Sequence, residues 1–248
     1  TMALAALSLS FAMLGFNTLN MIVDKDLDKI NKPLRPIPSG RVSVREAFVL
    51  MAALYAASII ISIWLGQLFL EVLISFILVS VLYTNPVTYL KKHIWATSVI
   101  GALLYGIIPF LTAWSVSGKE LPFVFLLFFG SLIFFIAPSK DLEDMKGERV
   151  RRISTLPVVL GKKRTIQFVV FGGSAVLIAM VAASITGLIG QKYLIATGMA
   201  LFVFIVANRP FLHNLNAENV VTQSSFVTAN MTASVVIELI YVIAHVVI

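Results

Sequence analysis

Two short acidic segments hold the side chains best suited to chemistry. In the first, residues 20–40, oxygen-bearing side chains recur at every fourth position, at Asn20, Asp24 and Asp28. If this segment is helical, the three side chains lie on one face, and Asp26 points away from it. Carboxylates lined up in this way repel one another where a helix leaves a membrane, so they require positive compensation.

The second acidic segment, residues 140–161, repeats this arrangement. Asp141, Asp144 and Glu148 stand at positions i, i+3 and i+7, which again places them on one helical face, while Glu143 falls off it. Each segment directly follows an apolar stretch. Two clusters of similar spacing therefore favour a shared task over an incidental charged helix end, the simpler reading in which Asp and Lys pair in headgroup water.

Carboxylate and amide oxygens suit Mg²⁺, which binds through a few protein oxygens together with substrate phosphates. Two such faces opposite each other would hold ions that clamp a diphosphate and stabilise it as a leaving group. The predicted metal ligands are Asn20, Asp24, Asp28, Asp141, Asp144 and Glu148. The four aspartates among them, Asp24, Asp28, Asp141 and Asp144, are the predicted catalytic residues.

Several basic residues are expected beside these carboxylates, where they would contact outer phosphate oxygens. The predicted diphosphate-binding residues are Asn20, Lys32, Arg35, Lys91 and Lys140.

The elements that must position these residues are transmembrane helices. Of the 248 residues, 59% are hydrophobic and only 12% charged, which excludes an ordinary soluble globule and a disordered chain. There is no cysteine, which excludes disulfides and thiolate metal sites. Eight stretches are long and apolar enough to cross a bilayer: 2–23, 43–64, 67–84, 95–115, 121–138, 165–187, 192–208 and 226–247. The predicted fold is all-α, a polytopic bundle around a central lipid-accessible cavity.

The net charge of +7 is distributed asymmetrically. If each stretch crosses once, every basic residue except Lys119 and Lys192 lies in loops on one side. The positive-inside rule assigns that side, with both acidic segments, to the cytoplasm. We therefore expect an integral protein of the cell membrane whose site faces the cytoplasm, and we attribute the basic surplus to membrane-surface loops rather than to nucleic acid.

The order of span, acidic face and basic loop recurs after four spans. This predicts one transmembrane domain, residues 1–248, with an internal pseudo-repeat of 1–115 and 121–248. The chain also opens inside an apolar run, from which we expect a further helix upstream. Oligomeric state cannot be read from the sequence.

The motifs resemble the UbiA superfamily of intramembrane prenyltransferases. Asn20, Asp24 and Asp28 are followed by the characteristic run Asn-Lys-Pro-Leu-Arg-Pro-Ile-Pro-Ser-Gly at residues 31–40. Lys-Asp-Leu-Glu-Asp-Met-Lys-Gly-Glu at 140–148 resembles the second signature, and Tyr83 with Lys91-Lys92 resembles a third. Two residues depart from the family pattern: Met21, where many members have Asp, and Glu148, where Asp is usual.

The resemblance implies nine helices, Mg²⁺ as cofactor and a prenyl diphosphate as donor. Its C–O bond would ionise to an allylic carbocation, which a lipophilic acceptor captures. Aromatic rings could shelter that cation, although ordinary packing or lipid contact is the simpler expectation for each ring. The candidates are Phe16, Tyr83, Tyr105, Phe134 and Phe135.

The second motif looks most like the archaeal branch that prenylates a phosphorylated glyceryl ether to give digeranylgeranylglyceryl phosphate. Arg149, Arg151 and Arg152, with Arg35 and Lys91, would suit a phosphate-bearing acceptor, but any cytoplasmic loop carries such charges. An aromatic acceptor of quinone-type biosynthesis stays open. So does a cation-coupled transporter, although transporters usually place their charges near the midplane. The Asp-Gly and Ala-Arg steps of a CDP-alcohol phosphotransferase are absent from the acidic segments.

Overall fold

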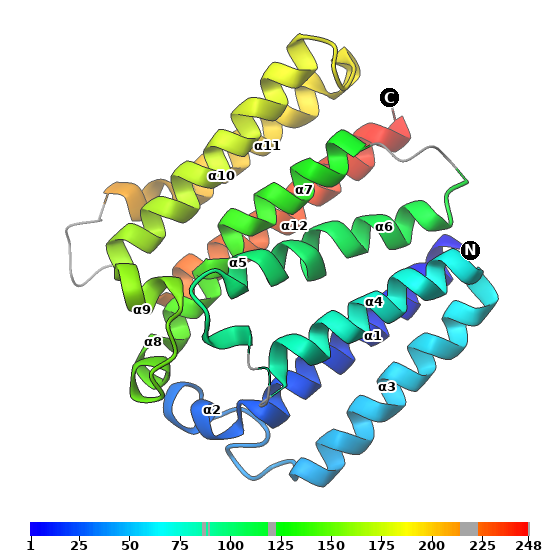
Figure 1. Cartoon of the computed structure of the whole chain (residues 1–248). Helices are drawn as coiled ribbons and strands as arrows, with labels where there is room; N and C mark the ends of the chain where they lie inside the picture. The colour runs from blue at the N-terminus through cyan, green and yellow to red at the C-terminus, as the bar shows by residue number, and fades with distance from the viewer. Residues whose placement is uncertain (86–87, 89, 119–122, 214–222, 248) are drawn as a thin grey trace.

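The computed structural model describes residues 1–85, 88, 90–118, 123–213 and 223–247, and regular structure in those residues is entirely helical (Figure 1). The first half contains α1 Met2–Val23, α2 Lys25–Asn31, α3 Val44–Leu65, α4 Gln67–Thr84, η1 Leu90–Lys92, α5 Ala96–Gly101, η2 Ala102–Ile107 and α6 Ile108–Ser115. The second contains α7 Phe123–Ile136, η3 Ala137–Lys140, α8 Asp141–Val150, α9 Leu156–Leu160, α10 Lys162–Ile185, η4 Gln191–Tyr193, α11 Leu194–His213 and α12 Gln223–Val247.

Seven of the described helical segments are long and apolar enough to cross a membrane, and a shorter apolar helix occupies Ser225–Tyr241. The predicted polytopic bundle is therefore confirmed, and the span count of eight holds approximately. The fifth span differs most from the prediction. It continues beyond residue 138 through η3 and α8, so that the helical segment runs over Phe123–Val150. The second acidic segment is thus a direct extension of a membrane helix.

The fourth span contains a wider turn. Residues 102–107 form a π-helical segment, η2, between α5 and α6. Pro109 follows in the first turn of α6, and since proline lacks an N–H and crowds the carbonyl four residues earlier, it accounts for the local widening. Gly106 lies against α7, where a Cβ would stand 2.8 Å from the Phe129 carbonyl oxygen. The close approach of the two helices therefore requires glycine here.

Small and hydroxylated residues bring α1 and α3 together. The Ser8 hydroxyl donates to the Ser58 carbonyl oxygen at 2.9 Å, and the Ser58 hydroxyl donates back to the Ser8 carbonyl oxygen at 2.8 Å. A Cβ on Gly15 would come within 2.8 Å of the Tyr55 ring. Small residues that permit close contact drive helix association where lipid removes the hydrophobic term.

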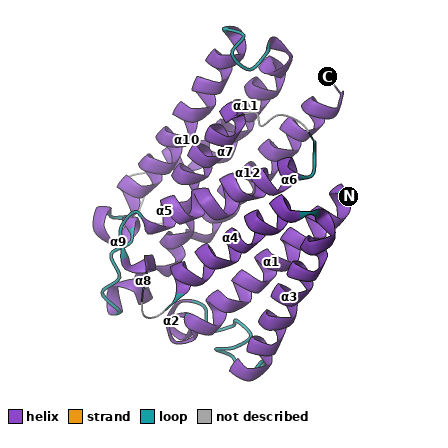
Figure 2. Ribbon diagram, turned by 45° about the vertical axis from the view of Figure 1, so that its right-hand side comes forward, coloured by secondary structure: helices purple, strands orange, loops and turns teal. Residues whose placement is uncertain are grey.

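Apolar packing divides between the two halves of the chain. One buried cluster draws on α1, α4 and the fourth span, and another draws on α7, α10, α11 and α12. Figure 2 shows the helices arranged as a bundle of roughly parallel rods. The internal repeat of 1–115 and 121–248 stays a prediction.

The short helices gather at one end of the bundle. There, α2, α8 and α9 lie together (Figure 1), and α2 packs directly on α8. Both acidic segments therefore meet at the same end, four spans apart in sequence.

Candidate active site

The first acidic segment lies at the junction of α1 and α2. Its backbone hydrogen bonds run from the Asp24 N–H to the Asn20 carbonyl, from Asp28 to Asp24 and from Lys32 to Asp28, at 2.8, 2.8 and 2.7 Å. The helical register therefore passes through the junction and aligns these residues. Asp24 and Asp28 are buried, 3% and 2% exposed, whereas Asp26 is exposed, as its position in the register predicts.

The second acidic segment occupies α8. Asp141, Asp144 and Glu148 are buried, whereas Glu143 is only partly so. The i, i+3, i+7 face thus points into the protein, and the structure agrees with the spacing. This face is directed towards α2, which places the two sets of carboxylates on facing helices.

Asn31 joins the two acidic segments. Its side-chain Nδ2 donates to the Asp144 carbonyl oxygen at 3.0 Å and lies 3.4 Å from the Asp144 carboxylate, while its Oδ1 accepts from the Gly147 N–H at 2.8 Å. A Cβ on Gly147 would stand 2.7 Å from Asn31 Nδ2 and 2.9 Å from Leu27, so only glycine fits between α2 and α8. We call this set of contacts the Asn31 clamp.

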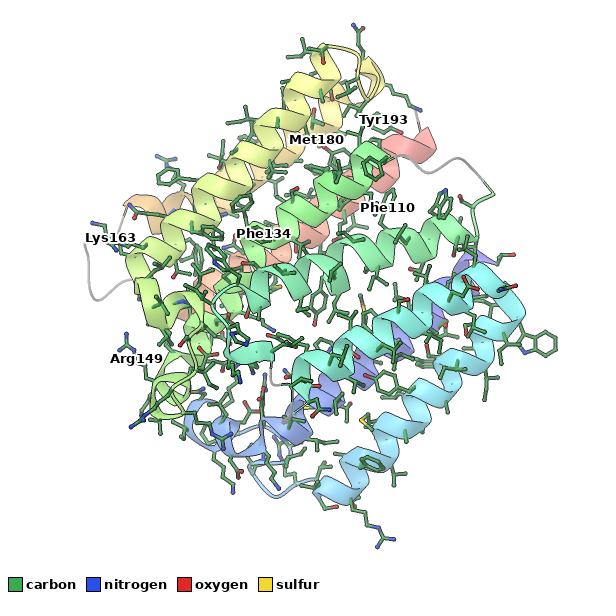
Figure 3. All side chains as sticks on the ribbon, viewed as in Figure 1. Phe110, Phe134, Arg149, Lys163, Met180 and Tyr193 are labelled. Carbon is green, nitrogen blue, oxygen red and sulfur yellow. The ribbon has the colours of Figure 1, made fainter. Side chains whose placement is uncertain are left out.

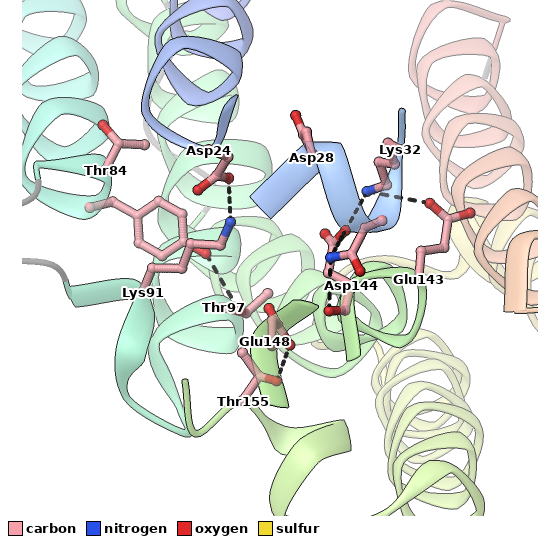
Figure 4. Close-up of polar contacts among 12 residues, drawn as sticks. Asp24, Asp28, Lys32, Thr84, Lys91, Thr97, Glu143, Asp144, Glu148 and Thr155 are labelled. Carbon is pink, nitrogen blue, oxygen red and sulfur yellow. Dashed lines mark hydrogen bonds and ion pairs between the residues drawn. The ribbon is translucent and has the colours of Figure 1, made fainter. Parts of the chain in front are cut away.

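Three cations pair with the carboxylates, and Figure 4 shows the pairs of Lys32 and Lys91. Lys91 Nζ lies 2.5 Å from Asp24, and Lys32 Nζ lies 2.8 Å from Asp144 and 3.6 Å from Glu143. The Arg35 guanidinium lies 2.8 Å from the Asp28 carboxylate. The Lys32 pair crosses from one acidic segment to the other, and the Lys91 pair connects α1 to η1. The structure therefore places these predicted diphosphate-binding residues beside the predicted metal ligands.

Lys140 differs from the other cations. Its ammonium lies 5.7 Å from the centre of the Tyr83 ring, within the range of a cation–π contact. It forms no ion pair with a carboxylate among the described residues. The neighbouring Asp141 carboxylate compensates its charge without an ion pair, so the ammonium is available to a phosphate.

Several buried oxygen atoms of the two segments lack a hydrogen-bond donor within the described part of the chain. They are Asn20 Oδ1, both carboxylate oxygens of Asp141, and Glu148 Oε1. The Thr97 hydroxyl lies beside Asp141 but outside hydrogen-bond geometry. Unpaired buried acceptors are costly, and hard oxygens of this kind are the ligands that Mg²⁺ takes. The residues present therefore fit the predicted ion.

The carboxylates do not already form a closed metal site. In the ranges that the structure describes, no three acidic or histidine side chains converge at metal-ligand distance. The reason lies in the ion pairs, because Lys32, Arg35 and Lys91 occupy carboxylate oxygens that an ion would take. The predicted metal ligands and catalytic residues stay a prediction.

Burial and charge shift the pKa values of Asp28 and Lys91. Burial raises the pKa of Asp28 above its ordinary value, and the Arg35 guanidinium offsets part of that rise. Burial alone would lower the pKa of Lys91, but the surrounding acidic groups, Asp24 foremost, together outweigh burial and raise it. Lys91 therefore stays charged throughout the physiological range, and Asp28 takes up a proton more readily than an ordinary aspartate does.

The aromatic candidates separate into two groups. Phe16 contacts both Tyr83 and Tyr105, with ring centres 6.4 and 6.3 Å apart. Because Tyr83 also carries Lys140 on its face, these three rings lie next to the polar site.

Phe134 and Phe135 pack against other aromatic residues. Phe134, on α7 (Figure 3), stacks on Trp95 at 6.2 Å, and Phe135 packs on Phe168 at 5.1 Å. These contacts are what ordinary packing predicts, and a role for the two rings in sheltering a cation stays a prediction.

Sequence reasoning assigned no role to three residues that the structure places in the site. Asn31 forms the clamp, the Thr155 hydroxyl donates to Glu148 Oε2 at 2.5 Å, and Tyr83 approaches the Thr97 hydroxyl at 3.4 Å. Asn31 sits seven residues after Asp24, on the same helical face, which is the one signal that could have identified it. The contacts of Thr97 and Thr155 depend on the tertiary fold.

Buried carboxylates and cations that gather at one end of a bundle of membrane helices are typical of an integral membrane protein with a functional site there. The chain belongs to a family of this class, since the model of the UbiA prenyltransferase family matches residues 1–229. It is therefore a prenyltransferase, as the resemblance of its motifs implied, and the transporter alternative is set aside.

Two relatives are similar to this chain in sequence along most of its length. The chain is 32% identical over 206 residues to the digeranylgeranylglyceryl phosphate synthase of Natronomonas pharaonis, which covers 81% of this chain and 72% of the relative. The corresponding enzyme of Methanococcus aeolicus is 30% identical over 218 residues, covering 88% and 76%.

Among solved structures, a UbiA homolog from Archaeoglobus fulgidus bound to DMAPP and Mg²⁺ superposes with a TM-score of 0.77 at 17% identity, covering 100% of this chain and 88% of that one. A structure of a digeranylgeranylglyceryl phosphate synthase gives 0.62 at 25% identity, covering 99% and 84%.

Proposed function

We propose that this enzyme transfers a prenyl group from a prenyl diphosphate to a lipophilic acceptor in a Mg²⁺-dependent reaction at the end of the bundle where α2 meets α8. One observation carries the proposal. The Asn31 clamp and the Lys32 pair hold two acidic helices together, and buried oxygens on both helices lack donors.

The residues that would hold Mg²⁺ come from both segments. They are Asn20, Asp24, Asp28, Asp141, Asp144 and Glu148. When bound, the ion supplies charge that screens the diphosphate and stabilises it as a leaving group. The unpartnered oxygens of Asn20, Asp141 and Glu148 are ready to accept such a ligand without breaking an existing bond.

The cations of the site exchange partners when the donor binds. Lys32, Arg35 and Lys91 turn from carboxylates to phosphate oxygens, as the carboxylates take up their other ligands. Lys140, which holds no carboxylate, contacts phosphate directly from its place above Tyr83. This exchange keeps the site charge-balanced both with and without substrate, which explains why buried carboxylates are tolerated here.

The rings next to the polar site would protect the reacting carbon of the donor. As the C–O bond of the donor breaks, the electron pair leaves with diphosphate and an allylic cation forms. We expect the rings of Phe16, Tyr83 and Tyr105, which pack on one another beside the polar site, to shelter that cation and to exclude water. The acceptor oxygen or carbon then forms the new bond to the cation and loses its proton.

Geranylgeranylglyceryl phosphate is the acceptor that the comparisons favour, because the two relatives described above are digeranylgeranylglyceryl phosphate synthases. Geranylgeranyl diphosphate is the matching donor. An aromatic acceptor is the rival substrate, and it differs in carrying no phosphomonoester.

A labelled-donor assay tests the proposal. Purified enzyme in proteoliposomes is incubated with radiolabelled geranylgeranyl diphosphate, Mg²⁺ and either geranylgeranylglyceryl phosphate or 4-hydroxybenzoate. We expect diphosphate release and a labelled product with the first acceptor, and abolition by EDTA. Release that persists in Asp24→Ala and Asp144→Ala would contradict the proposed site, whereas product from the aromatic acceptor alone would reassign the substrate.

The site is proposed to face the cytoplasm, since the basic loops share its side of the bundle. The chain has no cysteine, so a single Lys146→Cys variant reports this orientation. We expect a membrane-impermeant maleimide to label it in inside-out vesicles and to spare it in intact cells. The reverse pattern would overturn the orientation.

A further inference from the structure

A hollow with both polar and apolar lining lies next to residues of the active site. Its volume is about 460 Å³. It is lined by Lys92, His93, Ile94, Arg152, Ser154 and Val159. The hollow thus lies between the η1 turn and the segment that connects α8 to α9, and the Ser154 N–H joins the two by donating to the Lys92 carbonyl at 3.1 Å.

Neighbouring residues of the η1 turn point in different directions. Lys91 is 3% exposed and reaches Asp24 in the active site, whereas Lys92 is exposed and lines the hollow. Consecutive residues of the turn therefore contribute to the active site and to the hollow.

The facing segment has the same two-sided character. Ile153 and Thr155 are buried, and the Thr155 hydroxyl binds Glu148 of the active site. Arg152 and Ser154, which alternate with them, are exposed and line the hollow. Residues 153–155 thus point alternately inwards and outwards. Both walls of the hollow are thus continuous with residues that contact the catalytic carboxylates.

The hollow gathers positive charge without its own anion. Lys92, His93 and Arg152 form no ion pair with a carboxylate in the part of the chain that the structure describes. Arg151, next in the chain, instead turns to Asp26 at 3.6 Å. Arg152 has φ 57°, a left-handed conformation that directs it differently from its neighbour. Clustered cations of like sign favour an anionic ligand.

The hollow also has an apolar side. Ile94 and Val159 contribute hydrocarbon surface beside the cations. Trp95, the next residue, is 46% exposed and stacks on Phe134. An exposed tryptophan next to basic residues is typical of the membrane–water interface. The occupant should therefore combine an anionic head with a hydrocarbon chain.

We propose that this hollow binds the phosphomonoester head of a lipid. The Arg152 guanidinium and the Lys92 ammonium recognise the phosphate oxygens, with the Ser154 hydroxyl and a His93 N–H as further donors, and the chain extends past Ile94 towards Trp95. Such a lipid is either the acceptor of the proposed reaction or a bilayer phosphatidate. The acceptor assignment rests on the proposed function, whereas the binding site does not.

Binding is measured first, without prenyl diphosphate. Native mass spectrometry of the full chain in dodecyl maltoside gives the affinity for oleoyl lysophosphatidate, with uncharged oleoylglycerol as the matched lipid. We expect Lys92→Gln/Arg152→Asn to weaken lysophosphatidate binding at least about tenfold, since two charge-assisted contacts are lost, and to leave oleoylglycerol unchanged. Asparagine tolerates the left-handed backbone at residue 152.

The matched control is Lys146→Gln/Arg164→Asn, which removes two exposed cations outside the hollow and should bind lysophosphatidate as the unmodified chain does. Should the first double variant fail to fold, Ser154→Asp places an anion in the same hollow and should weaken binding similarly. A folded Lys92→Gln/Arg152→Asn protein that binds lysophosphatidate within about twofold of the unmodified chain overturns the proposal.

A kinetic experiment then identifies the source of the phosphate. If the acceptor occupies the hollow, the double variant raises the KM for geranylgeranylglyceryl phosphate about tenfold, leaves the KM for the donor unchanged, and phosphatidate competes with the acceptor. If a bilayer lipid occupies it, the acceptor KM is unchanged and phosphatidate raises the rate of the unmodified enzyme only. Either result supports a lipid phosphate site in the hollow. The site is contradicted if the unmodified enzyme and the double variant have the same acceptor KM and respond to phosphatidate in the same way.

Discussion

Replacing Asn31 with alanine removes the most direct polar link between the two acidic helices. The side chain forms a 3.0 Å bond to the Asp144 carbonyl and a 2.8 Å bond from the Gly147 N–H. Each such bond contributes about 1 kcal/mol net, so the clamp stabilises the joined arrangement by about 2 kcal/mol. Without the clamp, a Mg²⁺ ion shared between the two helices must bring them together when it binds. The lost free energy of about 2 kcal/mol corresponds to a Mg²⁺ affinity that is roughly 30-fold weaker.

The assay is a Mg²⁺ titration of prenyl transfer at saturating donor and acceptor. We expect Asn31→Ala to raise the Mg²⁺ concentration for half-maximal rate roughly 30-fold, while the rate at saturating Mg²⁺ stays within about threefold of the unmodified enzyme. Asn17→Ala is the matched control, because Asn17 is an exposed amide on α1. If Asn31→Ala lowers the maximal rate and leaves the Mg²⁺ dependence unchanged, the clamp does not assemble the metal site.

Three further predictions concern single side chains. Asp24→Asn should reduce the transfer rate at least about 100-fold, as expected for a lost charge-stabilising group, whereas exposed Asp26→Asn should change it less than about threefold; equal losses would refute the helical alignment. Gly147→Ala should raise the Mg²⁺ requirement as Asn31→Ala does, because the added Cβ would meet the Asn31 amide at 2.7 Å, and an unchanged titration curve would show that α2 and α8 separate freely. Asp28 must be ionised to bind a cation, and burial raises its pKa, so kcat/KM should begin to fall at a higher pH than it would for an ordinary aspartate. Arg35→Gln removes the cation that lowers this pKa and should move the fall in kcat/KM to still higher pH. A move to lower pH would contradict the role of Asp28 as the titrating ligand.

Much of the fold follows from the sequence because its determinants are local. About twenty apolar residues suffice to define a membrane span. Every fourth position of a helix faces the same way, which predicts Asp24 and Asp28 on one face and Asp26 off it, and the structure agrees. The span edges were less certain. Charged residues after 138 end the hydrophobic signal, but the helix itself continues to Val150.

The pairing of groups could not be predicted, because it depends on how helices distant in sequence meet. Lys91 lies 67 residues from Asp24 in the chain and Asn31 lies 113 from Asp144, and no local pattern selects these partners. The aromatic rings illustrate the same limit. Phe134 and Phe16 are equally plausible shields in sequence, yet only Phe16 packs beside Tyr83.

The central claim is that both acidic helices bind one magnesium–diphosphate unit, and calorimetry with an unreactive donor tests it most directly. Geranylgeranyl thiolodiphosphate is titrated into the unmodified chain, Asp24→Ala, Asp144→Ala and the double variant, each with and without Mg²⁺, and Asp26→Ala serves as the control. A shared site predicts that either single variant abolishes Mg²⁺-dependent binding and that the double variant loses nothing more. Full Mg²⁺-dependent affinity in either single variant would show that the two helices do not act on the same substrate.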